Sequence, residues 1–334
     1  MIKIGINGFG RIGRLVLRAA LERQGENFKI VSINDLGSLQ QNYHLLNFDS
    51  VHGKLNFKST IENNNLVIDE DKISFYNQRS PENIPWEENE VDIVLECTGL
   101  FTDADSAKKH LSKGVKKVLI SAPSNNAEIT VVFGVNSNLI SDRHDIISNA
   151  SCTTNCLAPV AKILNDNFGI EAGFMTTVHS FTSDQKIIDG LHKDARRGRT
   201  ASISMIPTST GAAKAVGLVL PELEGKLDGT AIRIPTPNVS MIDFTFQSKE
   251  IINKDDINKV IKKESSDKLK NILEYNDLPL VSIDYNHNSS SSIFDSTQTQ
   301  TVGDHFGRVL SWYDNEWGFS NRMIDVAKKI GDFI

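Results

Sequence analysis

The chain has 334 residues, of which 39% are hydrophobic and 23% charged, with 22 Gly, 9 Pro and a formal net charge of -6. These values are ordinary for a globular protein of about two domains, and they exclude disordered, collagen-like and disulfide-scaffold chains. No apolar run approaches the roughly 18 residues of a membrane span, and the acidic balance gives no reason to expect nucleic acid or an acidic membrane as a main partner. Three Cys and an N-terminus without a signal-peptide layout predict a cytoplasmic protein.

The first half of the chain alternates short apolar strands with helical patterns. We predict strands at Ile2–Ile6, Lys29–Ile33, Asp92–Glu96 and Lys117–Ile120, and helices at Arg11–Arg23 and Asp103–Leu111. This alternation is typical of a parallel sheet covered on both faces. A hairpin, Leu55–Thr60 with Leu66–Ile68, is expected to interrupt it.

From about residue 170 the pattern changes to longer strands, predicted at Ala172–Val178, Ala231–Ile234, Val239–Phe246 and Arg308–Tyr313. Their spacing indicates a second sheet, mixed or antiparallel. Helices are expected at Asp255–Leu273 and, near the end of the chain, at Ser320–Ile330.

A glycine motif directly follows the first strand. Gly8, Gly10 and Gly13 have the G-x-G-x-x-G spacing between a strand and a helix. In this motif the first glycine permits a tight turn, the second lets backbone N–H groups approach a pyrophosphate, and the third lets the helix lie close to the strand. Asp35 follows the second strand, where a carboxylate can bind ribose hydroxyls and repel a 2′-phosphate. The motif therefore predicts a dinucleotide site that favours NAD over NADP.

A candidate nucleophile stands at the start of another helical pattern. Ser151 is the predicted N-cap, which places Cys152 in the first turn, where the helix dipole is expected to lower the thiol pKa. Cys156 and Cys97 are interpreted as structural, and no metal site is expected. A base is also needed, and His179, at the end of a predicted strand, is a candidate that spacing alone does not distinguish from a structural histidine.

Four long motifs together resemble phosphorylating glyceraldehyde-3-phosphate dehydrogenase: Asn7–Arg14, Ser148–Pro159, Ser209–Val216 and Ser311–Trp317. They stand in the family's order and span essentially the whole chain. The resemblance implies that Cys152 attacks the aldehyde and His179 takes up the proton. Hydride then passes to NAD, and inorganic phosphate releases 1,3-bisphosphoglycerate from the resulting thioester.

The resemblance also implies sites for two anions. The substrate phosphate is assigned to Thr182 and Arg233, the attacking phosphate to Ser151, Thr153, Thr210 and Gly211, with Arg197 between the two. Hydroxyls and a glycine N–H suit oxyanions, and a guanidinium can bind one bidentately. The helix-like run Ala212–Val219 after Gly211 would add a helix N-terminus to the attacking-phosphate site.

For the cofactor, the resemblance adds a further set of residues to the three glycines and Asp35: Arg11, Ile12, Arg79, Thr98, Gly99, Ser121 and Asn315. Asn315 would bind the nicotinamide carboxamide. Many strictly NAD-dependent members have Leu-Pro where this chain has Gly190-Leu191, which leaves the strictness of the NAD preference open.

The expected fold is an α/β protein with a Rossmann NAD-binding domain, 1–150, and an α+β catalytic domain, 151–316, whose sheet is mixed or antiparallel. The C-terminal helix, 317–334, is expected to pack on the first domain. The resemblance also implies a homotetramer. Two alternatives remain: an erythrose-4-phosphate dehydrogenase, in which water resolves the thioester, and a non-enzymatic RNA- or protein-binding role.

Overall fold

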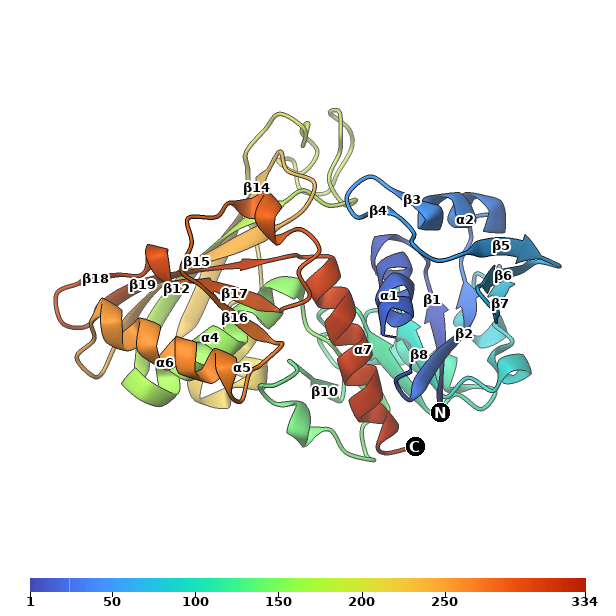
Figure 1. The fold of residues 1–334 in the computed structure, drawn as a ribbon, viewed down its shortest axis with the longest axis horizontal. Coiled ribbons are helices and arrows are strands. Elements are labelled where there is room, and N and C mark those ends of the chain that lie inside the picture. Colours follow the sequence, from blue (N-terminus) through green and yellow to red (C-terminus); the bar gives the residue numbers. More distant parts are fainter. Residues whose placement is uncertain (24) are drawn as a thin grey trace. The chain divides into compact units, whose positions relative to one another are not determined.

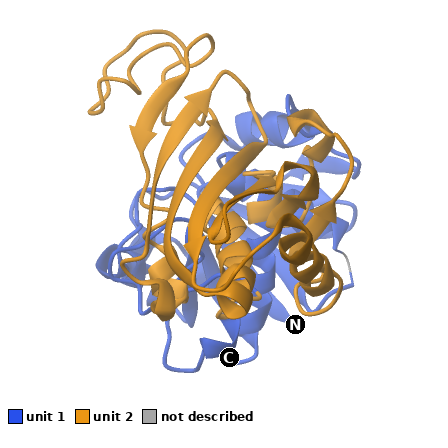
Figure 2. Ribbon diagram, turned by 90° about the vertical axis from the view of Figure 1, so that its left-hand side faces the viewer, with its two compact units in different colours: residues 1–133, 137–150, 320–334 blue, residues 134–136, 151–319 orange. Residues whose placement is uncertain are grey.

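The computed structural model describes residues 1–23 and 25–334, which form two compact units (Figures 1 and 2). Unit 1 comprises residues 1–133, 137–150 and 320–334, and unit 2 comprises residues 134–136 and 151–319. Within the described residues, no helix combines the length and apolar character needed to cross a membrane.

The described residues of unit 1 build a nine-stranded sheet in the order β10-β11-β9-β8-β1-β2-β7-β6-β5. Its strands are β1 Ile2–Asn7, β2 Phe28–Asn34, β5 Ser59–Glu62, β6 Asn65–Ile68, β7 Asp71–Tyr76, β8 Ile93–Glu96, β9 Lys117–Ile120, β10 Ile129–Thr130 and β11 Ile146–Ser148. All pairings from β10 to β7 are parallel, which confirms the predicted sheet.

The predicted hairpin is present, but its first strand begins at Ser59 rather than Leu55. Asn63 and Asn64 form the turn with φ values of 47° and 61°, the left-handed region that a two-residue hairpin turn requires. Strand β7 pairs antiparallel with β6 and parallel with β2, so it joins the hairpin to the parallel part of the sheet. The sequence pattern did not predict this third strand.

The other elements of unit 1 are α1 Arg11–Glu22, α2 Leu39–Asn47, β3 Phe48–Asp49, β4 Gly53–Lys54, η1 Pro81–Asn83, η2 Trp86–Asn89, α3 Ala104–Ala107, η3 Lys108–Leu111 and η4 Ser137–Leu139. The predicted helix Asp103–Leu111 is thus one α-helical turn, capped by the Asp103 side chain, followed by a 3-10 turn. Helix α7, Trp317–Gly331, ends in this unit. Its Asp325 pairs with Arg23 at 2.7 Å, which fixes it beside the end of α1.

The described residues of unit 2 form an eight-stranded mixed sheet in the order β13-β14-β12-β15-β19-β17-β16, with β18 paired to β19. The strands are β12 Ile170–Ser180, β13 Ile206–Ser209, β14 Leu227–Ile234, β15 Ser240–Ser248, β16 Leu273–Asn276, β17 Ser292–Asp295, β18 Gln300–Val302 and β19 Phe306–Tyr313. Strand β12 runs parallel to β14 and antiparallel to β15, so the predicted mixed sheet is confirmed.

Helices α4 Cys152–Phe168 and α6 Lys254–Ser266 lie side by side against this sheet (Figure 1). Short elements complete the unit: α5 Val216–Val219, η5 Pro221–Leu223, η6 Ser282–Tyr285 and η7 Ser296–Gln298. Helix α6 ends at Ser266, not at the predicted Leu273. Two serines and an aspartate at 265–267 favour helix poorly, and Asn271 adopts φ 65°, so the chain turns and Leu273 begins β16 instead.

Candidate functional site

Helix α4 starts at the candidate nucleophile. Ser151 is its N-cap, as predicted, and its hydroxyl accepts a hydrogen bond from Thr154 N at 3.0 Å. Cys152 is therefore the first helical residue, at the end of the helix where the backbone N–H groups have no carbonyl partner in a preceding turn. Ala150, just before the cap, has φ 55°, a left-handed conformation that a residue with a Cβ seldom adopts.

His179 lies on strand β12 and faces this cysteine. Its Nε2 is 3.6 Å from Cys152 Sγ, and the imidazole is only 4% exposed. Arg233 is the register partner of His179 on the parallel strand β14, so both side chains leave the sheet together. Arg233 Nη1 is 2.7 Å from His179 Nδ1, and it donates to Ser180 O at 2.9 Å. The structure therefore places three predicted residues in one cluster.

Burial dominates the electrostatics of this cluster. It raises the pKa of Cys152, and the nearby Arg233 guanidinium only partly opposes this. The expected lowering of the thiol pKa at the helix start is thus wrong for this structure. Burial, and then Arg233, lowers the pKa of His179 to about 3. At neutral pH the cluster consists of a thiol beside a neutral imidazole, which can act as a base toward that thiol.

Tyr313 completes the cluster, although sequence reasoning did not single it out. Its hydroxyl is 2.8 Å from Thr153 Oγ1 and 2.9 Å from Thr177 Oγ1, and its ring meets the His179 ring edge to face at 5.9 Å. Burial raises the pKa of Tyr313 well above its usual value, so the phenol keeps its proton. The Ser311–Trp317 motif could have pointed to Tyr313, because it includes the end of strand β19. In the sheet, β19 is two strands away from β12, which carries His179.

Arg197, a predicted phosphate ligand, is three-quarters buried and held at several points. Its guanidinium donates to Asp184 Oδ2 and to Thr208 Oγ1, both at 2.9 Å. Thr182 is half-buried two residues after β12. The structure shows no hydrogen bond from the Thr182 side chain to Arg197 or Arg233 among the described contacts.

Thr210 and Gly211 follow strand β13, but the helix expected at Ala212–Val219 is wrong. A run of turns fills 212–215, and the helix proper is only α5, Val216–Val219. Ala215 N donates to Gly211 O, four residues back, whereas Val216 N donates to Ala213 O, three residues back, so this segment is a run of turns and not a regular α-helix. Backbone N–H groups can still face an anion, but the helix N-terminus predicted beside Gly211 is not there.

Asn315 is 94% buried, and its side-chain oxygen is fixed by two serines. Ser180 Oγ and Ser240 Oγ each donate to Asn315 Oδ1 at 2.8 Å. With the oxygen engaged, the amide nitrogen is the part of the group left to bind another molecule. The two serines lie on neighbouring strands β12 and β15, and neither was predicted.

In unit 1 the predicted nucleotide residues surround a cavity of about 260 Å³ at the carboxyl ends of β1, β2 and β8. Its lining contains these predicted residues: Gly8, Gly10, Asp35, Arg79 and Thr98. This position, at the strand ends of a parallel sheet, is where α/β sheets bind ligands.

The glycine turn fits its predicted roles. Gly8 has φ 90°, and a Cβ on Gly13 would lie 2.1 Å from Gly8 O, so the helix can approach only without a side chain. Nothing lies within 4 Å of a Cβ on Gly10, which leaves open space beside its backbone. Asp35 accepts from Phe9 N at 2.8 Å and from Gly37 N at 2.7 Å, so its carboxylate is held at the cavity edge. A glycine-lined space beside a fixed carboxylate fits the pyrophosphate and ribose of NAD.

The remaining predicted cofactor residues do not line this cavity. The Arg11 guanidinium pairs with Asp49 at 2.5 Å, so only the backbone of Arg11 and Ile12 is left to serve the glycine turn. Gly99 is exposed and has φ 70°. Ser121 is half-buried, and its hydroxyl is hydrogen-bonded to the Cys97 thiol.

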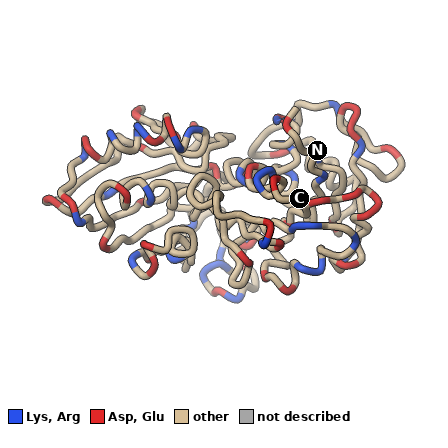
Figure 3. The backbone as a smooth tube through the Cα atoms, turned by 90° about the horizontal axis from the view of Figure 1, so that it is seen from below, with Lys and Arg blue, Asp and Glu red and all other residues tan. Residues whose placement is uncertain are grey.

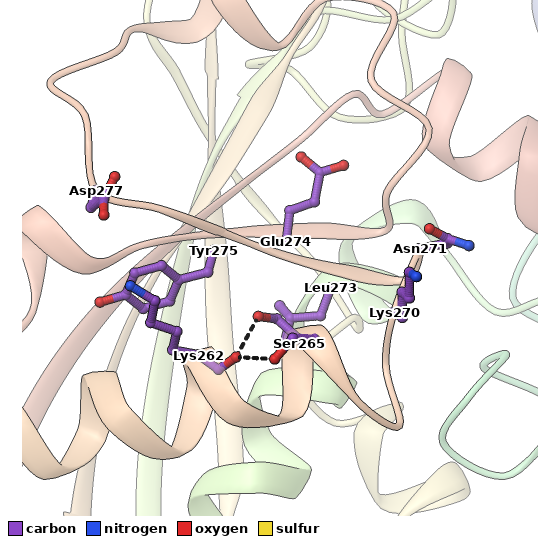
Figure 4. Close-up of a pocket in the computed structure, with 9 residues that line it drawn as sticks. Lys262, Ser265, Lys270, Asn271, Leu273, Glu274, Tyr275 and Asp277 are labelled. Atoms are coloured by element: carbon purple, nitrogen blue, oxygen red, sulfur yellow. Dashed lines mark hydrogen bonds between the residues drawn. The ribbon is translucent and has the colours of Figure 1, made fainter.

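Another cavity, of about 370 Å³, lies between α6 and β16 (Figure 4). It contains no predicted site residue, and the Lys262 ammonium is already seated over the Tyr275 ring at 5.0 Å. In the part of the chain that the structure describes, no group of three His, Cys, Asp or Glu side chains is placed to hold a metal ion. Lys and Arg are interspersed with Asp and Glu along the chain (Figure 3).

Comparison with known proteins decides the family. Residues 2–104 match the glyceraldehyde 3-phosphate dehydrogenase NAD binding domain, and residues 151–315 match the C-terminal domain of the same family. The chain belongs to the glyceraldehyde-3-phosphate dehydrogenase family. It is 55% identical over 330 residues to the glyceraldehyde-3-phosphate dehydrogenase of Xanthobacter flavus, covering 99% of this chain and 98% of that one. Over 98% of both chains it is 52% identical to glyceraldehyde-3-phosphate dehydrogenase 1 of Bacillus subtilis and 51% identical to the Geobacillus stearothermophilus enzyme.

Membership of this family makes the protein an NAD-dependent oxidoreductase. The family also implies that it binds a phosphorylated aldehyde substrate and phosphate. The predicted family, fold class, enzyme class and cofactor are thereby confirmed.

Proposed function

We propose that the protein oxidises D-glyceraldehyde 3-phosphate with NAD and inorganic phosphate to 1,3-bisphosphoglycerate, through a thioester on Cys152. The observation that carries the proposal is the contact between Cys152 Sγ and His179 Nε2 at 3.6 Å, at the start of a capped helix. A nucleophile within reach of a neutral base is the arrangement that covalent catalysis needs.

The cluster supplies each proton that the reaction moves. In the tautomer that donates from Nδ1 to Ser180 O, the Nε2 lone pair of His179 faces Cys152 Sγ. Sγ attacks the aldehyde carbon, and its proton passes through Nε2 to the aldehyde oxygen, which gives a hemithioacetal. His179 then takes that hydroxyl proton as the carbon loses a hydride, and a thioester remains. When bound, NAD supplies the acceptor for this hydride.

Phosphate completes the cycle. A phosphate oxygen attacks the thioester carbon, the carbon–sulfur bond breaks, and Sγ leaves as a thiolate that recovers the proton from His179. The backbone N–H of Cys152, at the helix start, is suited to stabilise the tetrahedral oxyanions. We assign the substrate phosphate to Thr182 and Arg233, with Arg197 shared, and the attacking phosphate to a set of neighbouring groups: Ser151, Thr153, Thr210 and Gly211.

For the cofactor, we assign the ribose to Asp35, the pyrophosphate to the glycine turn with the backbone of Arg11 and Ile12, and the nicotinamide carboxamide to Asn315. Arg79, Thr98, Gly99 and Ser121 are assigned to the walls of this site. The Asp35 carboxylate, held between two backbone N–H groups, disfavours the 2′-phosphate of NADP. The Gly190-Leu191 segment makes the NAD/NADP ratio the quantity to measure.

The deciding experiment follows NADH absorbance with glyceraldehyde 3-phosphate and NAD, with and without phosphate. Sustained turnover that requires phosphate, or arsenate in its place, supports the phosphorylating reaction. Sustained turnover without either anion would mean that water resolves the thioester, which is the chemistry of an erythrose-4-phosphate dehydrogenase. A Cys152→Ser variant should bind NAD and show no oxidation; turnover in that variant would rule out the covalent mechanism.

We further propose a cytoplasmic homotetramer. The loop 181–205 exposes large apolar side chains, among them Ile188 at 78%, Leu191 at 98% and Ile203 at 81%, which supports burial against other copies. The three cysteines are all free thiols, which suits a reducing compartment. Light scattering on the purified protein measures the oligomeric state, and a monomer at micromolar concentration would contradict the proposal.

A further inference from the structure

A chain of fully buried polar groups lies behind the nucleotide cavity. Glu96 ends strand β8 and His110 lies on η3; both side chains are 0% exposed, as is Trp86 on η2. The proposed chemistry gives none of these three a role, and none of them lines the cavity. Burying a carboxylate is costly unless hydrogen bonds satisfy it, so the contacts of Glu96 require an explanation.

The Glu96 carboxylate accepts four hydrogen bonds. Oε2 accepts from Asn7 Nδ2 at 2.6 Å and from His110 Nε2 at 3.0 Å. Oε1 accepts from Thr98 N at 2.8 Å and from the Thr98 hydroxyl. Asn7 Nδ2 and His110 Nε2 are 3.4 Å apart because both converge on the same oxygen. All the donors therefore depend on the position of this one carboxylate.

Trp86 determines which nitrogen of His110 carries the proton. The indole Nε1 of Trp86 is only a donor, and it lies 3.3 Å from His110 Nδ1. Nδ1 must then accept, so the ring proton is on Nε2 and points at Glu96. A proton on Nδ1 would face the indole N–H directly. Trp86 thus keeps His110 in the tautomer that donates to the carboxylate.

Two of the residues that donate to Glu96 form part of the cavity wall. Asn7 and Thr98 both line it, and Asn7 Oδ1 accepts from Asn34 Nδ2, another lining residue, at 2.8 Å. A Cβ on Gly8 would lie 2.6 Å from Thr98 N, so the Thr98 backbone packs directly on the glycine turn. A shift of Glu96 would therefore move both Thr98 and the turn on which the pyrophosphate is proposed to sit.

We infer that His110 and Trp86 are positioning residues for NAD: Trp86 orients His110, and His110 fixes Glu96, which holds Thr98 and Asn7 against the nucleotide. The inference rests on the proposed nucleotide site. Asp35→Ala tests that site separately, because Asp35 lies at the cavity edge and does not touch Glu96. Unchanged NAD affinity in Asp35→Ala would mean that the cavity is misassigned, whatever the His110 variants show.

The test compares two substitutions of His110 by calorimetric titration of the apoenzyme with NAD. Gln can accept from Trp86 and donate to Glu96, whereas Leu can do neither. We expect His110→Leu to raise the Kd for NAD about tenfold, as for loss of a hydrogen bond to a charged group, and His110→Gln to stay within about twofold. At saturating NAD, kcat should be unchanged, so the effect falls on KM. Equal weakening in both variants, or no weakening in His110→Leu, would overturn the inference.

Trp86→Phe is the milder variant and decides the matter if His110→Leu does not fold. It removes the indole N–H and keeps an aromatic ring in place, and we expect the Kd for NAD to rise about threefold. Trp312→Phe is the matched control, because Trp312 Nε1 also donates one side-chain hydrogen bond, to the Asp295 carboxylate at 3.1 Å in unit 2. Combining Thr98→Ala with His110→Leu should cost less than the sum of the two single changes, since both act on one contact. Additive losses would contradict a route through Thr98.

Discussion

Arg233 and His179 meet at a single ring nitrogen. Arg233 Nη1 is 2.7 Å from His179 Nδ1, the atom that also faces Ser180 O at 2.7 Å. The two neighbours require opposite proton positions, because a guanidinium N–H needs Nδ1 to accept and the carbonyl needs it to donate. An anion that draws Arg233 away leaves Ser180 O as the partner, and His179 then has the tautomer that can receive the Cys152 proton. If Arg233 binds the substrate phosphate, as proposed above, binding of that phosphate would favour the His179 tautomer that accepts the Cys152 proton.

Replacing Arg233 by Gln should raise the pKa of both Cys152 and His179, because the guanidinium lowers each of them. Alkylation of Cys152 by iodoacetamide at pH 7.5 should slow by about tenfold for each unit by which the thiol pKa rises. The rate is measured against pH in the apoenzyme, with Arg233→Lys as the charge-conserving control. Identical pH profiles in the Gln variant and the wild type would show that the guanidinium has no such effect.

His179 should make the protein sensitive to mild acid. Its pKa is lowered to about 3 in the fold, so between roughly pH 6.5 and pH 3 the unfolded chain binds a proton that the folded chain does not. Stability is then lost as the pH falls through this window. His179→Asn should recover up to about 2–3 kcal/mol at pH 4.5 relative to pH 7, seen as a smaller drop in Tm. The exposed His305 provides the control: His305→Asn is measured alongside, and only the difference between the two variants is attributed to the buried His179.

Two glycines of the same turn should respond differently to substitution. Gly13→Ala should destabilise the fold itself, by more than about 2 kcal/mol, because its Cβ would lie 2.1 Å from Gly8 O. Gly10→Ala meets nothing within 4 Å and should keep the Tm of the wild type while weakening NAD binding about tenfold or more. Thermal melts and NAD titration separate the two effects. A Gly10→Ala variant with wild-type affinity would mean that the pyrophosphate does not approach this backbone.

We predict that Ser240 affects the reaction with NAD because its hydroxyl helps to orient the Asn315 side chain. In Ser240→Ala the Asn315 oxygen loses one of its two serine donors, so the amide is less firmly oriented. We expect kcat/KM for NAD to fall about three- to tenfold, as for loss of one neutral hydrogen bond. Ser248 is on the same strand and 2% exposed, and its hydroxyl contacts the backbone carbonyls of Glu250 and His305, so Ser248→Ala is the matched control. An equal loss in Ser248→Ala would point to a general effect on β15.

Local patterns carried much of the prediction. The sequence was sufficient to predict the Ser151 cap, the strand that ends near His179 and the three-glycine turn, because each depends on residues adjacent in sequence. The end of α6 and the missing helix after Gly211 were not, since turns and strand pairing outweigh helical periodicity there.

The contacts made across the sheet could not be predicted from the sequence. The Arg233 contact with His179 follows from the register of β12 and β14, which pairs residues 54 apart. Tyr313 reaches Thr153 over a separation of 160 residues. The direction of the Cys152 pKa shift was also wrong because a helix start is visible in sequence, whereas the burial that outweighs it is not.

The strained backbone of Ala150 lies two residues before the nucleophile, so the position of Cys152 depends on the contacts that hold Ala150 in place. Its φ of 55° is held by its surroundings, with its N–H donating to Ser148 Oγ at 3.1 Å, and a non-glycine residue in this conformation stores about 1–2 kcal/mol. On warming, that segment has a local reason to relax toward an ordinary backbone conformation before the sheets melt. Loss of activity should therefore precede loss of ellipticity in a temperature ramp, and the gap between the two curves should narrow in Ala150→Gly, in which the strain is absent.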